Sequence, residues 1–153
     1  MPMTDFYNLF SDQQAITVSA ASNATGNGGV IDLLGSSTDV FFGATLQPNE
    51  GGNMLYLKVS VGSTQFVGAG ATLTCELQES PDKSTWANTI IGSAVAVPVA
   101  QLLPGQILLW APLPFFGGSI LPPQRLLRYL RMWYIVTGGP FTAGTINAQI
   151  ETY

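Results

Sequence analysis

The chain has 153 residues, of which 46% are hydrophobic and only 9% are charged, and its formal net charge is −4. This length suits a single domain with a substantial core, although a typical globular domain has about 25% charged residues. Five basic residues in total are too few for the broad basic patch that phosphate binding usually needs, so we expect no nucleic-acid partner.

The first thirteen residues carry aromatic side chains without a strand pattern. Phe6, Tyr7 and Phe10 lie in "MPMTDFYNLF", where apolar and polar residues show no sustained alternation. Exposed aromatic residues near a chain end usually dock on another surface. We therefore expect residues 1–13 to form an N-terminal arm that docks on a partner protein, a sister subunit or its own sandwich. Residues 14–153 are expected to form one domain.

Three segments alternate with a period of two, which indicates strands with one buried and one wet face. They are 54–61, 71–79 and 145–151, with apolar positions Leu55, Leu57, Val59 and Val61, then Leu73, Cys75 and Leu77, then Ile146, Ala148 and Ile150. The residues between them, including Glu76 and Glu151, are expected on the wet faces. Weaker candidate strands cover 14–19, 30–34, 89–97 and 106–111.

Turn-forming residues separate these segments. "SPDKSTW" (80–86) places Pro and Asp where a type I turn favours them, and "TGGPFTAGT" (137–145) is a Gly-rich connection. The prolines of "APLPFFGGSILPP" (111–123) rule out a helix there, because proline lacks a backbone donor. About eight short strands with such connections predict an all-β fold, an eight-stranded jelly-roll or Greek-key β-sandwich.

Three of the five basic residues stand close together, at Arg125, Arg128 and Arg131. A helix would place these three side chains together through i, i+3 spacing, but the Tyr, Trp, Ile and Val residues that follow favour a strand over 128–136. Such a strand turns alternate residues to opposite faces. One face receives Leu130, Met132, Tyr134 and Val136, and the other receives Tyr129, Arg131, Trp133 and Ile135.

An apolar loop over 111–124 leads directly into this strand. Exposed together, the loop and the arginine-aromatic face would form an apolar patch that a monomer seldom tolerates, and Arg, Tyr and Trp often anchor protein contacts. We therefore expect a protein interface formed by Phe6, Tyr7, Phe10, Phe115, Phe116, Ile120, Leu121, Arg128 and Arg131. Alternatively, the arginines pair with carboxylates of the same chain and cover apolar surface with their stems.

The sequence offers no recognisable catalytic or metal site. It has no His, which excludes the commonest general base, the Ser–His pairing and most zinc sites. Cys75 alternates with Leu73 and Leu77, as a packed core thiol would. Glu76 and Glu79 are interpreted as solvated side chains. We expect no enzymatic activity, no cofactor and no metal.

Targeting signals are equally scarce. The opening ten residues have neither a basic n-region nor an apolar h-region, and no apolar run approaches the roughly 18 residues that span a bilayer. The single Cys75 forms no internal disulfide, which suits synthesis in a cytoplasm. We expect no membrane partner.

Three stretches, in this order along the chain, resemble the small jelly-roll cement (decoration) proteins of tailed-bacteriophage capsids. They are "LFSDQQAITVSAASN", "GAGATLTCELQESPDKSTW" and "RYLRMWYIVTGGPFTAGTINAQI". The family motifs match Phe10 to Thr17, Leu73 to Ser80, Arg128 to Arg131 and Gly139 to Gly144. Each motif alone is weak, but the ordered set covers most of the chain and is much more specific.

The resemblance implies a structural protein of the virion that binds the outer surface of the major capsid protein shell. It would brace the shell against the pressure of packaged DNA and would be made in the cytoplasm of the bacterial host. It would act as a homo-oligomer, with a dimer favoured over a trimer, although the loops 35–53 and 111–124 depart from the family pattern. The alternative is a carbohydrate- or receptor-binding β-sandwich module of a virion, with Trp86, Trp110 and Trp133 as a sugar platform if they share one exposed face.

Overall fold

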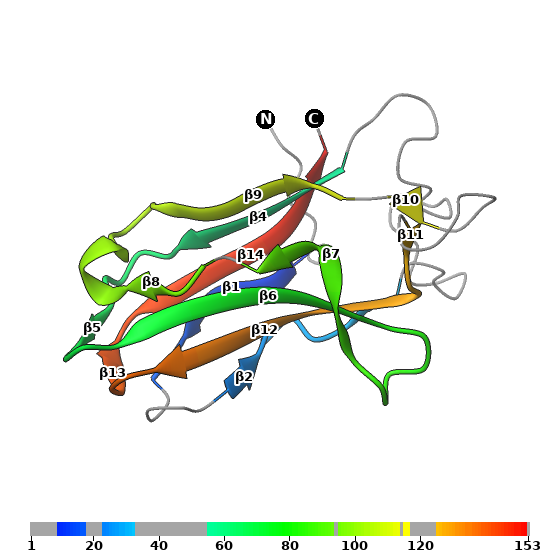
Figure 1. Ribbon diagram of the computed structural model, residues 1–153. Coiled ribbons are helices and arrows are strands. Elements are labelled where there is room, and N and C mark those ends of the chain that lie inside the picture. Colours follow the sequence, from blue (N-terminus) through cyan, green and yellow to red (C-terminus); the bar gives the residue numbers. More distant parts are fainter. Residues whose placement is uncertain are drawn as a thin grey trace.

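The regular secondary structure of the described part of the chain is almost entirely β-strand (Figure 1). The computed structural model describes residues 9–17, 23–32, 55–93, 95–113, 115–116 and 125–152. Within these residues the single helical element is the short 3-10 helix η4 (Val99–Gln101). No helix in the described residues is long and apolar enough to span a membrane. The expected all-β fold is confirmed.

Two antiparallel sheets build the domain. Sheet I has the order β1 (Leu9–Ala15), β14 (Thr145–Thr152), β4 (Leu55–Val61), β9 (Ile107–Pro112). Sheet II has the order β2 (Asn23–Thr25), β12 (Tyr129–Thr137), β6 (Thr72–Ser80), β7 (Ala87–Ser93), with β3 (Ile31–Asp32) also paired to β12 and β8 (Val97–Pro98) to β6. Two small ribbons lie at opposite ends in Figure 1: β5 (Val67–Gly68) with β13 (Phe141–Ala143), and β10 (Phe115–Phe116) with β11 (Arg125–Leu126).

The chain passes repeatedly from one sheet to the other. If β1, β2, β4, β6, β7, β9, β12 and β14 are numbered from one to eight, sheet I reads 1-8-3-6 and sheet II reads 2-7-4-5. First and last strands are thus neighbours, and the second and seventh strands pair on the opposite sheet. We interpret this order as a jelly roll, a double-sheet arrangement of eight strands.

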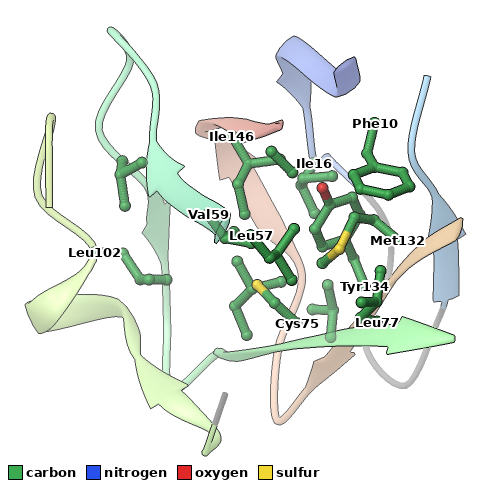
Figure 2. Close-up of a cluster of buried hydrophobic side chains, with 14 of the residues drawn as sticks. Phe10, Ile16, Leu57, Val59, Cys75, Leu77, Leu102, Met132, Tyr134 and Ile146 are labelled. Carbon is green, nitrogen blue, oxygen red and sulfur yellow. The ribbon is translucent and has the colours of Figure 1, made fainter. Parts of the chain in front are cut away.

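The core lies between the two sheets, where the period-two positions meet (Figure 2). All four apolar positions of β4 are buried, and so are Leu73, Cys75 and Leu77 of β6. The strands over 54–61, 71–79 and 128–136 are therefore confirmed with the predicted faces. Each fully buried Leu or Val side chain contributes about 1.5–3 kcal/mol relative to an exposed one. Burial also raises the pKa of Cys75, which is a packed core thiol as expected.

The first strand differs from the prediction of a strand over 14–19. It runs over Leu9–Ala15 and pairs with β14, with register shifts between Leu9 and Ser11 and between Ser11 and Gln14. Gln13 has a positive φ of 41°. Such bulges break the two-residue period, which is why alternation failed to reveal the strand. Residues 9–13 of the arm predicted over residues 1–13 therefore belong to the sandwich, and residues 1–8 lie outside the described residues.

Hydrogen bonds hold this irregular strand in place. The Ser11 hydroxyl lies 2.6 Å from the buried Tyr134 hydroxyl and donates to Gln14 Oε1 at 2.8 Å. Gln13 Oε1 accepts from both the backbone N–H and the hydroxyl of Ser63, each at 2.9 Å. Phe10, beside Ser11, is completely buried (Figure 2). Phe10 is thus a core residue, which corrects its prediction as part of a docking arm.

Three weaker strand predictions hold with shifted bounds. The segment 106–111 forms β9, while 89–97 is divided between β7 and β8. The segment 30–34 contributes β3, and its residues 33–34 lie outside the described residues.

Candidate protein interface

Strand β12 presents the predicted arginine-aromatic face on the outside of sheet II. Leu130, Met132, Tyr134 and Val136 are buried, whereas Tyr129, Arg131, Trp133 and Ile135 are half-buried on the other face. Arg131 stands opposite Gln78 of β6, and Trp133 stands opposite Glu76. The strand interpretation of 128–136 is therefore correct, and the outward residues are fixed by a regular antiparallel ladder.

The guanidinium group of Arg131 is stacked on two indole rings. Its Cζ lies 4.2 Å from the ring centroid of Trp86 and 4.5 Å from that of Trp133. Such cation–π contacts are worth about 0.5–1 kcal/mol at exposed sites and more when desolvated. We call this group the Arg131 stack. Partial burial lowers the pKa of Arg131, but an arginine in a protein stays charged.

Gln78 fixes the orientation of the stacked guanidinium. Its Oε1 accepts from Nε of Arg131 at 2.9 Å and from Nη2 at 2.8 Å. Its Nε2 donates to Asn88 Oδ1 at 3.2 Å and to Glu76 Oε2 at 3.4 Å. Because every polar atom of the Gln78 side chain is engaged, the amide holds Arg131 at a defined position over sheet II.

The turn between β6 and β7 places the ring of Trp86 against Arg131. Asp82 Oδ1 accepts from the backbone N–H groups of Ser84 at 2.9 Å and Thr85 at 3.0 Å, a side-chain-to-backbone pattern that defines tight turns. Hydrogen bonds lower the pKa of Asp82, and the bond from the Thr85 N–H has the largest effect. Trp86 Nε1 donates to the Lys83 carbonyl at 3.2 Å. The predicted turn over 80–86 is therefore present, and it positions an indole ring.

Arg128 has a different environment from Arg131. It forms a bidentate pair with Asp32, with Nε and Nη2 each 2.9 Å from a carboxylate oxygen, and this pair raises the pKa of Arg128. Its Cζ also lies 4.8 Å from the Tyr129 ring centroid, and Lys83 Nζ lies 4.6 Å from the same ring. The intramolecular alternative thus describes Arg128, while Arg131 has an amide rather than a carboxylate as its partner.

The structure describes only some of the remaining predicted interface residues. Phe115 and Phe116 form β10, which pairs in parallel with β11 so that Phe115 is opposite Arg125. The backbone of Phe115 and Phe116 therefore lies beside the segment that leads into β12. Phe6, Tyr7, Ile120 and Leu121 lie outside the described residues.

The three tryptophans do not share a face. Trp86 and Trp133 flank Arg131 on sheet II, whereas Trp110 belongs to β9 of sheet I, opposite Lys58. The Trp110 ring centroid lies 6.0 Å from that of Tyr56. A platform of all three rings is therefore not present, which removes the feature that favoured a sugar-binding module.

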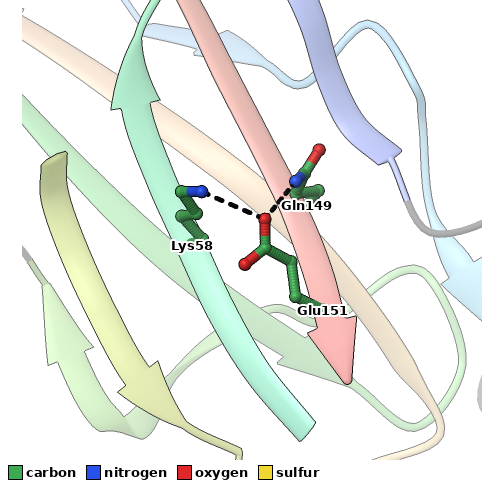
Figure 3. A network of polar contacts seen from close by, with 3 residues as sticks. All are labelled: Lys58, Gln149 and Glu151. Carbon is green, nitrogen blue, oxygen red and sulfur yellow. Dashed lines mark hydrogen bonds and ion pairs between the residues drawn. The ribbon is translucent and has the colours of Figure 1, made fainter. Parts of the chain in front are cut away.

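Sequence reasoning missed a charged pair on sheet I. Lys58 Nζ lies 3.2 Å from Glu151 Oε1, which also accepts from Gln149 Nε2 (Figure 3). Glu151 is only 4% exposed, so its prediction as a wet-face residue is wrong. The two partners are 93 positions apart, and no local pattern in the sequence indicates that β4 and β14 are neighbours.

No metal-binding group was found among the described residues, where no three His, Cys, Asp or Glu side chains gather. Glu79, interpreted from the sequence as solvated, is half-buried and accepts the Leu127 N–H at 2.8 Å. Burial raises the pKa of Glu79 and this hydrogen bond opposes the rise. Glu79 therefore fixes the backbone ahead of β12.

These features define a class: an antiparallel β-sandwich whose second sheet carries an arginine-tryptophan cluster on its outer face. The chain matches the Bbp16 family over residues 10–150 and therefore belongs to that family. The match includes every strand of both sheets at least in part. No curated protein matches the chain.

Proposed function

We propose that the chain is a structural capsid cement (decoration) protein of a tailed bacteriophage. In this proposal it binds the outer surface of the major capsid protein shell and stabilises the shell against the pressure of packaged DNA. The bacterial host makes it in its cytoplasm, and it functions on the virion without enzymatic activity or a cofactor. The ordered sequence resemblance, from Phe10 to Gly144, supports this assignment.

The observation that carries the proposal is the Arg131 stack on a rigid outer sheet face. Two indole rings and a held guanidinium are the residue types that dominate protein contacts. Arg131 and Trp133 project from a nine-residue ladder between β12 and β6, and Trp86 comes from the hydrogen-bonded turn between β6 and β7, so little conformational freedom is lost when a partner binds. A brace needs such a rigid contact surface, repeated by symmetry on neighbouring subunits.

Self-association forms the second part of the proposal, with a dimer favoured over a trimer. Large apolar side chains in the described residues are exposed on β5, on β9 and in the segment between η4 and β9, namely Val67, Leu103, Ile107 and Trp110. With only 9% charged residues, little electrostatic repulsion separates copies of the chain. An oligomer that contacts several shell subunits gains affinity through effective concentration even when each contact is weak.

Cosedimentation with purified, expanded, empty shells of the encoding phage tests the proposal. We expect the chain to pellet with shells at a saturating stoichiometry, and to have the mass of a homo-oligomer in solution. Binding to soluble glycans in place of shells would contradict the proposal and would favour a carbohydrate-binding module. A monomer both in solution and on shells would contradict the oligomeric part alone.

A further inference from the structure

Four of the five basic residues have side chains that the structure describes, and these four fall into two groups. Lys58 and Arg128 are neutralised by Glu151 and Asp32. Lys83 and Arg131 have no ion pair among the described residues, and both instead lie over aromatic rings on the outer face of sheet II. Lys83 and Arg131 are thus two cations without an ion pair on the same outer face as Glu76, in a chain whose net charge is −4.

Arg131 also has unused hydrogen-bonding capacity. A guanidinium group has five N–H donors in a planar fork. One from Nε and one from Nη2 donate to Gln78, which leaves three on Nη1 and Nη2 without a partner in the described part of the chain. A pair of parallel N–H groups on Nη1 and Nη2 matches the two oxygens of a carboxylate.

Glu76 is a candidate for an internal partner, and it does not fill this role. It lies on the same face and accepts from Nε2 of Gln78, but it forms no ion pair with Arg131 among the contacts of the described residues. The stack thus holds the charged guanidinium of Arg131 in place. No carboxylate of the described residues forms an ion pair with its Nη1 and Nη2 groups. Trp86 and Trp133 both lie against the guanidinium group, and three N–H groups on Nη1 and Nη2 remain for recognition.

We propose that the Arg131 stack is a carboxylate-binding point and that its occupant is an exposed acidic segment of the shell protein, which presents an Asp or Glu side chain to Nη1 and Nη2. This inference rests on the proposed function, because it names the chemistry of the partner surface. The indole rings exclude water around the pair, so the contact belongs to the class of desolvated charge pairs whose truncation strongly weakens binding.

Shell cosedimentation with three variants tests the inference. Arg131→Gln keeps a polar side chain but removes the charge and the fork, and we expect affinity to fall by about thirtyfold or more. Arg128→Gln is the matched control, since that arginine is already paired with Asp32 on the same face, and we expect its affinity to change less than about threefold. Melting curves of both variants check that the fold is kept.

Arg131→Lys supplies a chemical readout of the partner. A carbodiimide joins an amine directly to a carboxylate, so mass spectrometry of the treated complex at saturating protein should find residue 131 linked to an Asp or Glu of the shell protein. Bound variant that is linked through other lysines but not through residue 131 overturns the inference.

The outcomes separate the two proposals. Unchanged binding by Arg131→Gln, or equal losses for both arginine-to-glutamine variants, overturns the inference while the cement function stands. Failure of the unaltered chain to bind shells at all overturns both. Selective loss by Arg131→Gln together with the carboxylate crosslink supports both.

Discussion

Replacing Phe10 with Ala tests whether the start of the opening motif is core or contact surface. The side chain is completely buried between the sheets, so its removal loses the transfer free energy of the ring and leaves a cavity. Buried Phe→Ala changes cost about 3–5 kcal/mol, against a total stability of about 5–15 kcal/mol for a typical domain. For a chain of this length the melting temperature should fall by about 6–20 °C.

Urea unfolding followed by tryptophan fluorescence measures this loss, with Val95→Ala as the control. Val95 is 84% exposed, so its truncation should change stability by no more than about 0.5 kcal/mol. If Phe10→Ala unfolds at the same urea concentration as the unaltered chain and only loses shell binding, Phe10 is a docking residue and the placement of β1 is wrong.

Three further predictions concern hydrogen bonds and close packing that stabilise the fold. Ser11→Ala should cost about 1–3 kcal/mol because it strands the buried Tyr134 hydroxyl, and adding Tyr134→Phe should recover part of that loss in a double-mutant cycle. Gly144→Ala should lower the melting temperature much more than Gly70→Ala, since both have positive φ but a Cβ at Gly144 would overlap an aromatic ring while Gly70 faces open space. Folding lowers the pKa of Asp82. The ionised carboxylate therefore stabilises the fold above its unfolded pKa near 3.8, and this stabilisation is lost as the pH falls below that pKa. The gap in melting temperature between the unaltered chain and Asp82→Asn should therefore be largest near pH 7 and should narrow below pH ~4.

Each of these predictions has an outcome that contradicts it. Strict additivity in the Ser11 and Tyr134 cycle would mean that the two hydroxyls do not interact. Equal melting temperatures for the two glycine variants would show that the ring beside Gly144 moves away at no cost. If the difference in melting temperature between the unaltered chain and Asp82→Asn stays constant from pH 7 to pH 3, the carboxylate does not stabilise the turn.

The parts of the fold that a sequence reveals are those governed by local periodicity. Strands β4 and β12 alternate without interruption, and β6 alternates over residues 72–78, so both their existence and their buried faces follow from the order of residues. Strand β1 could not be located in this way, because two register shifts and the positive φ of Gln13 break its alternation. Its position depends on partners such as Ser63, which is 50 positions away.

For the same reason, the sequence predicts only part of the candidate site. Alternation alone places Arg131 and Trp133 on one outward face, but it cannot show that a turn brings Trp86 over the same guanidinium or that Gln78 holds it. Arg128 was assigned to the interface together with Arg131, and only the pairing with Asp32, 96 positions away, separates the two. Long-range pairing therefore decides which arginine remains available to a partner.

The glycines of the closing motif have a structural explanation. A side chain at Gly139 would overlap the carbonyl oxygen of Ala69, and one at Gly144 would overlap the ring of Phe66, which packs edge-to-face on Phe141 at 4.8 Å. This part of the resemblance to cement proteins therefore reflects close packing at the β5–β13 end of the sandwich. The shell-binding chemistry is expected elsewhere, on the outer face of sheet II.

Cryo-electron microscopy of virions of the encoding phage, with and without this chain, tests the central claim most directly. The cement function predicts extra density on the outer surface of the shell into which the β-sandwich fits, with Arg131, Trp86 and Trp133 turned toward the major capsid protein. Virions that lack the chain should lose this density and should release their DNA at a lower temperature. Identical shell density in both preparations, or density for the chain only at the tail, would contradict the claim.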